Sequence, residues 1–171
     1  MTGADNQQER PGYYIAGYVD GEGSFHVAIQ KNRCTLVGYQ LVPEFRVSQN
    51  QERNSVLKLI QEVLKCGYIK QNHPGNDRDQ TQVLVVRNRK DLLTKVIPFF
   101  EMYPIISAKA DEFRRFAFIV RAMSKGKHLQ RDGFIELLEI AFSMNGNGRY
   151  RRLSVSGIVS DLKSSETICR T

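Results

Sequence analysis

The chain has 171 residues, of which 41% are hydrophobic and 25% are charged. This composition is that of an ordinary globular protein, so it excludes wholesale disorder, and the length predicts one domain whose core needs no disulfides. Lys and Arg number 25 against 18 Asp and Glu, and the net charge of +7 favours an acidic partner, either nucleic acid or an anionic surface.

The cysteines and histidines give no metal-binding pattern. There are three of each, and none of the cysteines has a partner at zinc-ligand spacing. Scattered, odd-numbered cysteines favour a reducing, intracellular setting. The polar residues 1–10 lack the apolar segment of a secretory signal. No apolar run approaches the roughly 20 residues that span a bilayer, so we expect no membrane partner.

The N-terminal third predicts a helix followed by a hairpin. Residues 1–10 are predicted to be a flexible lead-in, and Pro11 is well placed to begin a helix that continues to Val19. A turn is expected over residues 20–23, because their two glycines oppose helix continuation. Alternating apolar and polar residues then predict two strands with one polar face, over residues 24–31 and 39–48.

The rest of the chain predicts further helices and a second hairpin. The expected strands are residues 68–70 and 81–87, joined by a polar turn. The expected helices, each with an apolar stripe, are residues 53–65, which end near Gly67, and residues 90–100, 107–123 and 131–144. A basic segment at 149–152 that could contact phosphate opens a tail over residues 149–171, which then becomes Ser-rich. Hairpins separated by helices predict an α+β fold with antiparallel strands, in one domain over residues 11–148.

Residues 15–23, Ile-Ala-Gly-Tyr-Val-Asp-Gly-Glu-Gly, resemble the nine-residue signature of the LAGLIDADG homing endonucleases. The small pair Ala16-Gly17, and an acid between two glycines directly before a strand, carry the match. The order of predicted elements over residues 12–144 also resembles the αββαββα core of that family, with its antiparallel DNA-binding sheet. Only one copy of the motif is present. One-copy chains of this family pair as homodimers, so the resemblance implies a motif helix of each subunit at a two-fold interface.

The motif residues suit this arrangement physically. Small residues at Ala16 and Gly17 let two helices approach closely, and we expect both, with Asp20, at the dimer interface. Each helix then delivers Glu22 beside its symmetry mate, and two such carboxylates repel unless a divalent cation lies between them. Oxygen ligands suit Mg²⁺, so Glu22 and the Gly21 carbonyl are the expected metal ligands. The alternative is that Asp20 and Glu22 are ordinary turn acids.

The resemblance implies three more catalytic residues. Family members most often carry Asp where this chain has Glu22, whose longer stem keeps the carboxylate but changes its geometry. The segment 45–53 resembles the one in which a Gln and an Arg reach the active site, here Gln49 and Arg53; Gln can order water and Arg can offset phosphate charge. Lys109 lies where relatives often have a basic residue near the cleft, although Ser107 stands at a nearby position where some relatives have Lys. The alternative is that these are solvated polar residues.

The polar sheet face is the expected DNA surface. Eight strand residues span roughly 26 Å at about 3.3 Å each, nearly one turn of major groove, so two subunits would read a long, pseudo-palindromic site. Arg and Lys suit guanine, Gln and Asn suit adenine, and Glu can accept from cytosine. Any one of these residues could instead be merely solvated. The expected DNA-binding residues are His26, Gln30, Asn32, Gln40, Glu44, Arg46, Ser48, Lys70, Asn72, Gln80 and Gln82.

These features predict a homodimeric, Mg²⁺-dependent, site-specific DNA endonuclease that makes a double-strand break and is encoded by a mobile intron. The first alternative is a maturase-like protein that binds intron RNA with the same fold. The second is a DNA-binding regulator with inactive acids, against which the presence of Glu22, Gln49 and Arg53 argues. The expected location is an organelle, either chloroplast or mitochondrion, or a prokaryotic cytoplasm.

Overall fold

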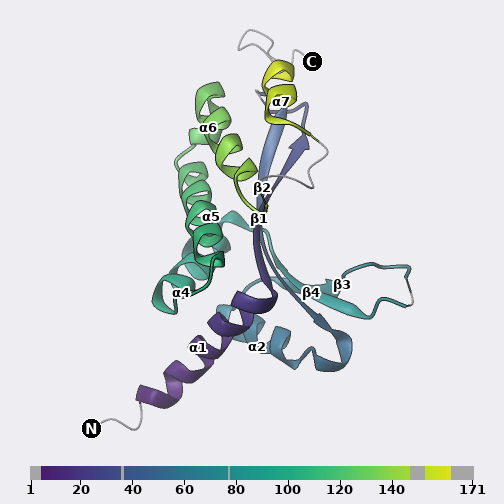
Figure 1. Cartoon of the computed structure of the whole chain (residues 1–171), viewed down its shortest axis with the longest axis vertical. Coiled ribbons are helices and arrows are strands. Elements are labelled where there is room, and N and C mark those ends of the chain that lie inside the picture. Colours follow the sequence, from purple (N-terminus) through teal and green to yellow (C-terminus); the bar gives the residue numbers. More distant parts are fainter. Residues whose placement is uncertain (1–4, 36, 77, 147–152, 163–171) are drawn as a thin grey trace. The chain divides into compact units, whose positions relative to one another are not determined.

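The computed structural model describes residues 5–35, 37–76, 78–146 and 153–162, so the basic segment 149–152 lies outside the described residues. It has the predicted α+β architecture, built on a sheet with strand order β1-β2-β4-β3 (Figure 1). Strand β4 is antiparallel to both β2 and β3. None of the described helices is long and apolar enough to cross a membrane. In chain order the elements are α1 (Asp5–Glu22), β1 (Gly23–Lys31), β2 (Tyr39–Asn50), η1 (Gln51–Arg53), α2 (Ser55–Leu64), β3 (Tyr68–Gln71), β4 (Thr81–Val86), α3 (Arg89–Asp91), η2 (Leu92–Val96, a π-helix), α4 (Ile97–Met102), α5 (Lys109–Ser124), η3 (Lys127–Leu129), α6 (Arg131–Phe142) and α7 (Val155–Asp161).

The described residues divide into two compact units. The first unit holds the residues up to Phe25 and Glu44–Asp111, and the second holds His26–Pro43 and the residues from Glu112 onward. Strands β1 and β2 therefore each contribute residues to both units.

Helix α1 is longer at both ends than the sequence predicts. It begins at Asp5, with Pro11 inside it, so the prediction of a flexible lead-in is wrong for residues 5–10. Gln, Glu and Arg, which favour helix, dominate these residues, and an acid at the helix start complements the helix dipole. The helix also continues through the predicted turn to Glu22 and leads directly into β1.

An aromatic cluster forms the core of the first unit. The rings of Phe25 and Phe45 stack at 5.2 Å, and Phe100 meets both edge-on, at 5.4 and 5.5 Å. The predicted apolar stripe of α2 is buried at Leu57 and Ile60. Offset and edge-on ring pairs stabilise a core beyond the area they bury, so this cluster anchors the helices to the sheet.

Two helical details depart from the predicted pattern. Helix α2 ends at Leu64 because Lys65, with φ of 51°, already adopts the left-handed conformation expected further along at Gly67. The helix predicted over 90–100 contains the π-helix η2, in which the Ile97 N–H bonds to the Leu92 carbonyl. Pro98 follows at once and has no N–H to donate, so the wider turn lies where the regular bond to Thr94 cannot form.

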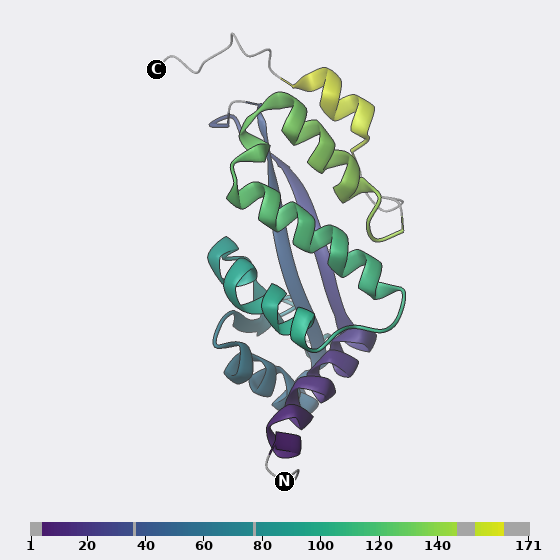
Figure 2. The same cartoon turned by 90° about the vertical axis from the view of Figure 1, so that its left-hand side faces the viewer.

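The second unit covers part of the first hairpin with helices. In Figures 1 and 2, α5 and α6 lie on one side of the segments His26–Lys31 and Tyr39–Pro43. The predicted stripes are buried, with Phe116 of α5 and Phe134 of α6 almost wholly inaccessible.

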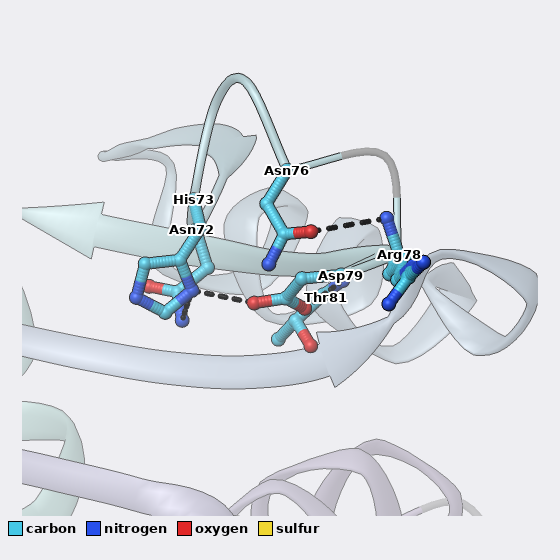
Figure 3. Close-up of polar contacts among 6 residues, drawn as sticks. All are labelled: Asn72, His73, Asn76, Arg78, Asp79 and Thr81. Carbon is cyan, nitrogen blue, oxygen red and sulfur yellow. Dashed lines mark hydrogen bonds and ion pairs between the residues drawn. The ribbon is translucent and has the colours of Figure 1, made fainter.

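The turn between β3 and β4 is held by polar side chains (Figure 3). His73 Nδ1 lies 2.5 Å from Asp79 Oδ2, and the Thr81 N–H donates to Asp79 Oδ1 at 2.9 Å. The Arg78 N–H donates to Asn76 Oδ1 at 3.2 Å. Hydrogen bonds from Thr81, and then from His73, lower the pKa of the Asp79 carboxyl from 3.8 to about 2.

Asp79→Asn is expected to make the free energy of unfolding depend less on pH between about 4 and about 2. A carboxyl whose pKa is depressed on folding contributes stability above its unfolded value of 3.8, and loses it as the pH falls through about 2. Urea titrations between these pH values measure the free energy of unfolding. The exposed Asp132→Asn, outside the turn, is the matched control. An unchanged slope in Asp79→Asn would contradict the role of this carboxylate.

Candidate functional site

In the first unit, the last turns of α1 contact the end of β2. Gln49 Nε2 donates to the hydroxyl of Tyr18 at 2.6 Å, and the Asn50 N–H donates to Gln49 Oε1, also at 2.6 Å. Both ends of the Gln49 amide are therefore engaged, and the side chain is held in one orientation. Burial raises the pKa of Tyr18; the hydrogen bond from Gln49 lowers it, and the negative charge of Glu22 raises it again. The net shift is upward, so the phenol stays protonated.

Lys109, the first residue of α5, binds the C-terminal end of α1. Its ammonium donates to the carbonyl oxygens of Val19 at 2.9 Å, Gly23 at 2.6 Å and Gly21 at 3.5 Å. Burial lowers the pKa of Lys109, and the charges of Asp20 and Glu22 oppose that shift. A cation is favourable at a helix C-terminus, where backbone carbonyls lack partners. This contact explains why α1 continues through Gly21 to Glu22.

Asp20 of α1 binds Ser107, two residues before α5. It accepts hydrogen bonds from the Ser107 N–H, at 3.2 Å, and from the Ser107 hydroxyl. Ser107, at the position where some relatives have Lys, therefore serves here as a hydrogen-bond partner of the motif acid Asp20. The structure gives Asp20 a partner within the chain, and its place at a dimer interface stays a prediction.

The exposed face of α1 includes only part of the small-residue pair predicted to lie at a dimer interface. Ala16 is 3% exposed and faces the chain's own core, so its prediction as an interface residue is wrong. Gly17 and Gly21 are exposed, and a Cβ added to either would meet no atom within 4 Å. Tyr13 and Tyr14 are more than half exposed on the same helix. Helical spacing places Tyr14, Gly17 and Gly21 on one side of α1.

Glu22 is the exposed last residue of α1, beside Gly21, whose carbonyl is one of the acceptors near Lys109. Within the described residues no three His, Cys, Asp or Glu side chains come together as a metal-binding group. Mg²⁺ is commonly held by one or two carboxylates, with water and phosphate oxygens completing its shell. The donor set fits such a cation, provided that further ligands come from outside this chain.

Arg53 lies near this site in sequence but is less constrained. It ends η1, the short turn after β2, and is exposed. The Asn50 side chain caps this turn by accepting from the Glu52 N–H at 3.0 Å. Of the four predicted catalytic residues, the structure thus connects Glu22, Gln49 and Lys109 through α1, and leaves Arg53 on the adjoining turn.

The predicted DNA-binding residues of the second unit form a chain of amides. Asn32 Nδ2 donates to Gln40 Oε1 at 2.8 Å, and Gln40 Nε2 donates to Gln30 Oε1 at 3.0 Å. His26, further back on β1, is half-buried. The amide chain fixes which end of each side chain donates, and therefore which hydrogen-bonding groups each one offers outward.

In the first unit, strand register defines a face of the sheet, here called the open face, on which Arg46, Ser48 and Lys70 are partly or fully exposed while Val83 and Val85 are buried. Ser48 and Lys70 are the cross-strand neighbours of Val83, and Arg46 is opposite Val85, so all of these share one face. Lys70 is exposed, and Arg46 and Ser48 are half-buried. The prediction of a uniformly polar face is wrong at β4, where Val83 and Val85 lie on it.

Two predicted DNA-binding residues of the first unit are misplaced. Gln82 lies opposite Gln49, on the face with Phe45, and its Oε1 accepts from Asn54 Nδ2 at 2.8 Å. Glu44 has the predicted face but is only 2% exposed, so it is unavailable to a base. Gln80 is exposed and Asn72 half-buried, both in the turn between β3 and β4.

Sequence reasoning missed two residues that the structure brings to these sites. Tyr18 was not among the expected site residues, although a hydroxyl four residues before Glu22 shares its helix face. Arg87 ends a predicted strand and was not among the expected site residues, but its Nε donates to Glu44 across the sheet. Only the pairing of β2 with β4, which joins the two predicted hairpins, places Arg87 beside Glu44.

The comparisons with known proteins show to which family the chain belongs. The family model described as LAGLIDADG endonuclease matches residues 15–120. The chain belongs to this family. DNA endonuclease I-CeuI of Chlamydomonas moewusii is 35% identical to it over 104 residues, which make up 61% of this chain and 46% of that protein. The chain thus spans less than half the length of this curated relative.

Solved structures of the family are similar over most of the chain. The archaeal intron-encoded homing endonuclease I-Vdi141I, complexed with DNA, superposes with a TM-score of 0.80 at 30% identity, covering 91% of this chain and 95% of that one. I-SmaMI, bound to an uncleaved DNA target in the presence of calcium ions, superposes with a TM-score of 0.73 at 28% identity, covering 78% of this chain and 44% of that one.

Proposed function

We propose that this protein is a site-specific DNA endonuclease encoded by a mobile intron. The observation that carries the proposal is the exposed Glu22 carboxylate at the end of α1, beside the Lys109 ammonium and one helical turn from the Tyr18–Gln49 pair. This arrangement joins an anionic metal ligand, a cation and an oriented amide. Relatives named as endonucleases, and a DNA-bound neighbour, support cleavage over the maturase alternative.

The site residues divide the work of phosphodiester hydrolysis. Glu22 and the Gly21 carbonyl would hold Mg²⁺, which supplies Lewis-acid activation of water and of the leaving oxygen. Lys109 and Arg53 offset the negative charge that develops on the phosphate. Gln49, fixed by Tyr18, orients a water near the phosphate. The calcium-containing complex of I-SmaMI supports a divalent cation in this role.

The protein acts as a homodimer in this proposal. One chain supplies one Glu22, so a second copy is needed to bring two carboxylates together and to cut both strands. The exposed glycines of α1, at which a Cβ meets nothing within the chain, support a close approach of two such helices across a two-fold axis. Each open face then reads one half of a pseudo-palindromic DNA site.

A cleavage screen tests this function directly. The protein is incubated with a library of randomised DNA duplexes, with Mg²⁺ or with a chelator, and the cut ends are sequenced. We expect staggered double-strand cuts in one pseudo-palindromic sequence, only with Mg²⁺. A complete lack of cutting with Mg²⁺, or cutting without sequence preference, would contradict the proposal.

Tyr18→Phe is expected to slow cleavage about fivefold, because one hydrogen bond contributes about 1 kcal/mol net. The hydroxyl that accepts from Gln49 is lost, so the amide no longer has one orientation. DNA affinity should not change, because Tyr18 is not on the open face. Tyr103→Phe removes a hydroxyl elsewhere in the first unit and is the control. Single-turnover rates with saturating enzyme separate cleavage from binding; equal rates for Tyr18→Phe and wild type would exclude this role.

A further inference from the structure

Glu44 is a buried acid on the open face of the sheet. It is 2% exposed, and both its carboxylate oxygens contact guanidinium groups. Arg46 Nε lies 2.7 Å from Oε1, and Arg87 Nε donates to Oε2. One third of the Arg46 side chain and about half of the Arg87 side chain stay exposed. The carboxylate is therefore covered, while both cations remain accessible to a ligand.

Strand register explains why these three residues meet. Glu44 and Arg46 are two residues apart on β2, so they share one face. Arg46 pairs with Val85 of β4; the same register, continued by two residues, sets Arg87 opposite Glu44. Two arginines that would otherwise repel are thus brought together around one acid, and the three side chains keep one net positive charge.

The contacts leave a specific part of each arginine free. A guanidinium has five N–H donors. Here the Nε of Arg87 donates to Glu44, and the Nε of Arg46 forms an ion pair with it without a hydrogen bond. The two terminal Nη groups can still make the bidentate contact that recognises O6 and N7 of guanine. Holding a long side chain in its binding conformation lowers the conformational entropy lost on binding. Glu44 is too buried to accept a hydrogen bond from cytosine itself.

We propose that Glu44 is a positioning residue that makes Arg46 and Arg87 one base-reading pair. This inference rests on the proposed function, because it needs a sequence-specific DNA target. Neither arginine reads its base independently of the other, since each is oriented by the carboxylate they share. Loss of Glu44 therefore relaxes base preference at both positions. It does not weaken binding to DNA in general, because a negative charge is removed from the binding face.

The test is a cleavage and binding profile over all single-base variants of the target. Arg46→Ala and Arg87→Ala first identify the base pair that each residue reads. Glu44→Gln is expected to lower discrimination at both of these base pairs by about tenfold, within the range that one bidentate contact provides. Binding to non-target DNA stays equal or becomes tighter. In the Arg46→Ala Arg87→Ala background, Glu44→Gln changes nothing further. Glu62→Gln, an exposed charge-matched change on α2, leaves the profile intact.

Other outcomes overturn the inference. An unchanged Glu44→Gln profile, or a change at a base pair that neither arginine reads, removes Glu44 from this role. A uniform loss over all sequences, with a lower melting temperature, makes Glu44 a folding residue only. If Glu44→Gln does not fold, Arg87→Lys provides the test. Lys keeps the positive charge but lacks the planar guanidinium, so this variant must relax base preference at the base pair that Arg46 reads. A wild-type protein without any base preference would instead overturn the proposed function.

Discussion

Replacing Glu22 by Gln is expected to slow DNA cleavage by at least about 10³-fold, because metal-ion stabilisation of the transition state contributes several kcal/mol and each 1.4 kcal/mol is tenfold in rate. Gln has nearly the same shape as Glu but no negative charge, so it is a poor ligand for Mg²⁺. Glu22 is exposed, so the folded chain should be as stable as wild type. DNA affinity measured without metal should be preserved, since the open face is unchanged.

Single-turnover cleavage in a Mg²⁺ titration measures the effect of Glu22→Gln. Glu52→Gln is the matched control, because Glu52 is an exposed acid on the turn that carries Arg53. It should cleave like wild type. Glu22→Gln that retains substantial Mg²⁺-dependent nicking would show that another group holds the metal.

Gly17→Leu is expected to dissociate the proposed dimer while leaving the single chain folded. A Cβ at Gly17 meets no atom of the chain within 4 Å, so the larger side chain does not disturb the fold. Replacing a helical glycine should even stabilise the monomer, by about 0.5–1 kcal/mol. At a two-fold axis the added side chain occurs twice, and overpacking costs about 1–3 kcal/mol at each copy. The dimer dissociation constant should therefore rise by about 10²-fold or more.

Gly17→Leu is expected to stabilise the monomer and to weaken the dimer, and these opposite effects make the prediction specific. Thermal unfolding measures monomer stability, and sedimentation measures association. Ser55→Leu, which enlarges an exposed residue at the start of α2, should leave both the wild-type dimer and cleavage intact. Gly17→Ala should lie between wild type and Gly17→Leu in dimer affinity. A wild-type protein that is monomeric at micromolar concentration with DNA present, or a Gly17→Leu dimer as tight as wild type, would contradict the interface.

The alternation and the helical period in the sequence predict most of the fold. Phe25 and Val27 of β1, Leu57 and Ile60 of α2, and Phe134 and Leu137 of α6 are buried as their spacing indicates. These patterns succeed because each depends only on the geometry of one strand or one helix. The same reasoning assigned Gln82 to the wrong face of β4, because Gln80 and Gln82 were taken to lie beside Lys70 before the register between strands was known.

The sequence predicted most of the residues that belong to the candidate site but not the hydrogen bonds between them. The motif predicts Glu22 directly, and the resemblance adds Gln49 and Lys109. The bond between Gln49 and Tyr18 joins residues 31 apart, and the one between Arg87 and Glu44 joins residues 43 apart. Such partners depend on which elements pack together. For this reason the sequence indicated Glu44 as a base reader, whereas the structure buries it between two arginines.

The sequence by itself determined the family, the α+β order of elements, the acid that ends the motif and the parity of most buried residues. Only the tertiary structure decided that α1 continues through Asp20-Gly21-Glu22, a segment whose local preference is a turn. Lys109 and Ser107, more than 80 residues further along the chain, bind the helix carbonyls and Asp20. Local propensity favours a turn by only about 1 kcal/mol per glycine. Partners for otherwise unpaired carbonyls outweigh that preference, and they come from residues that the fold alone brings near.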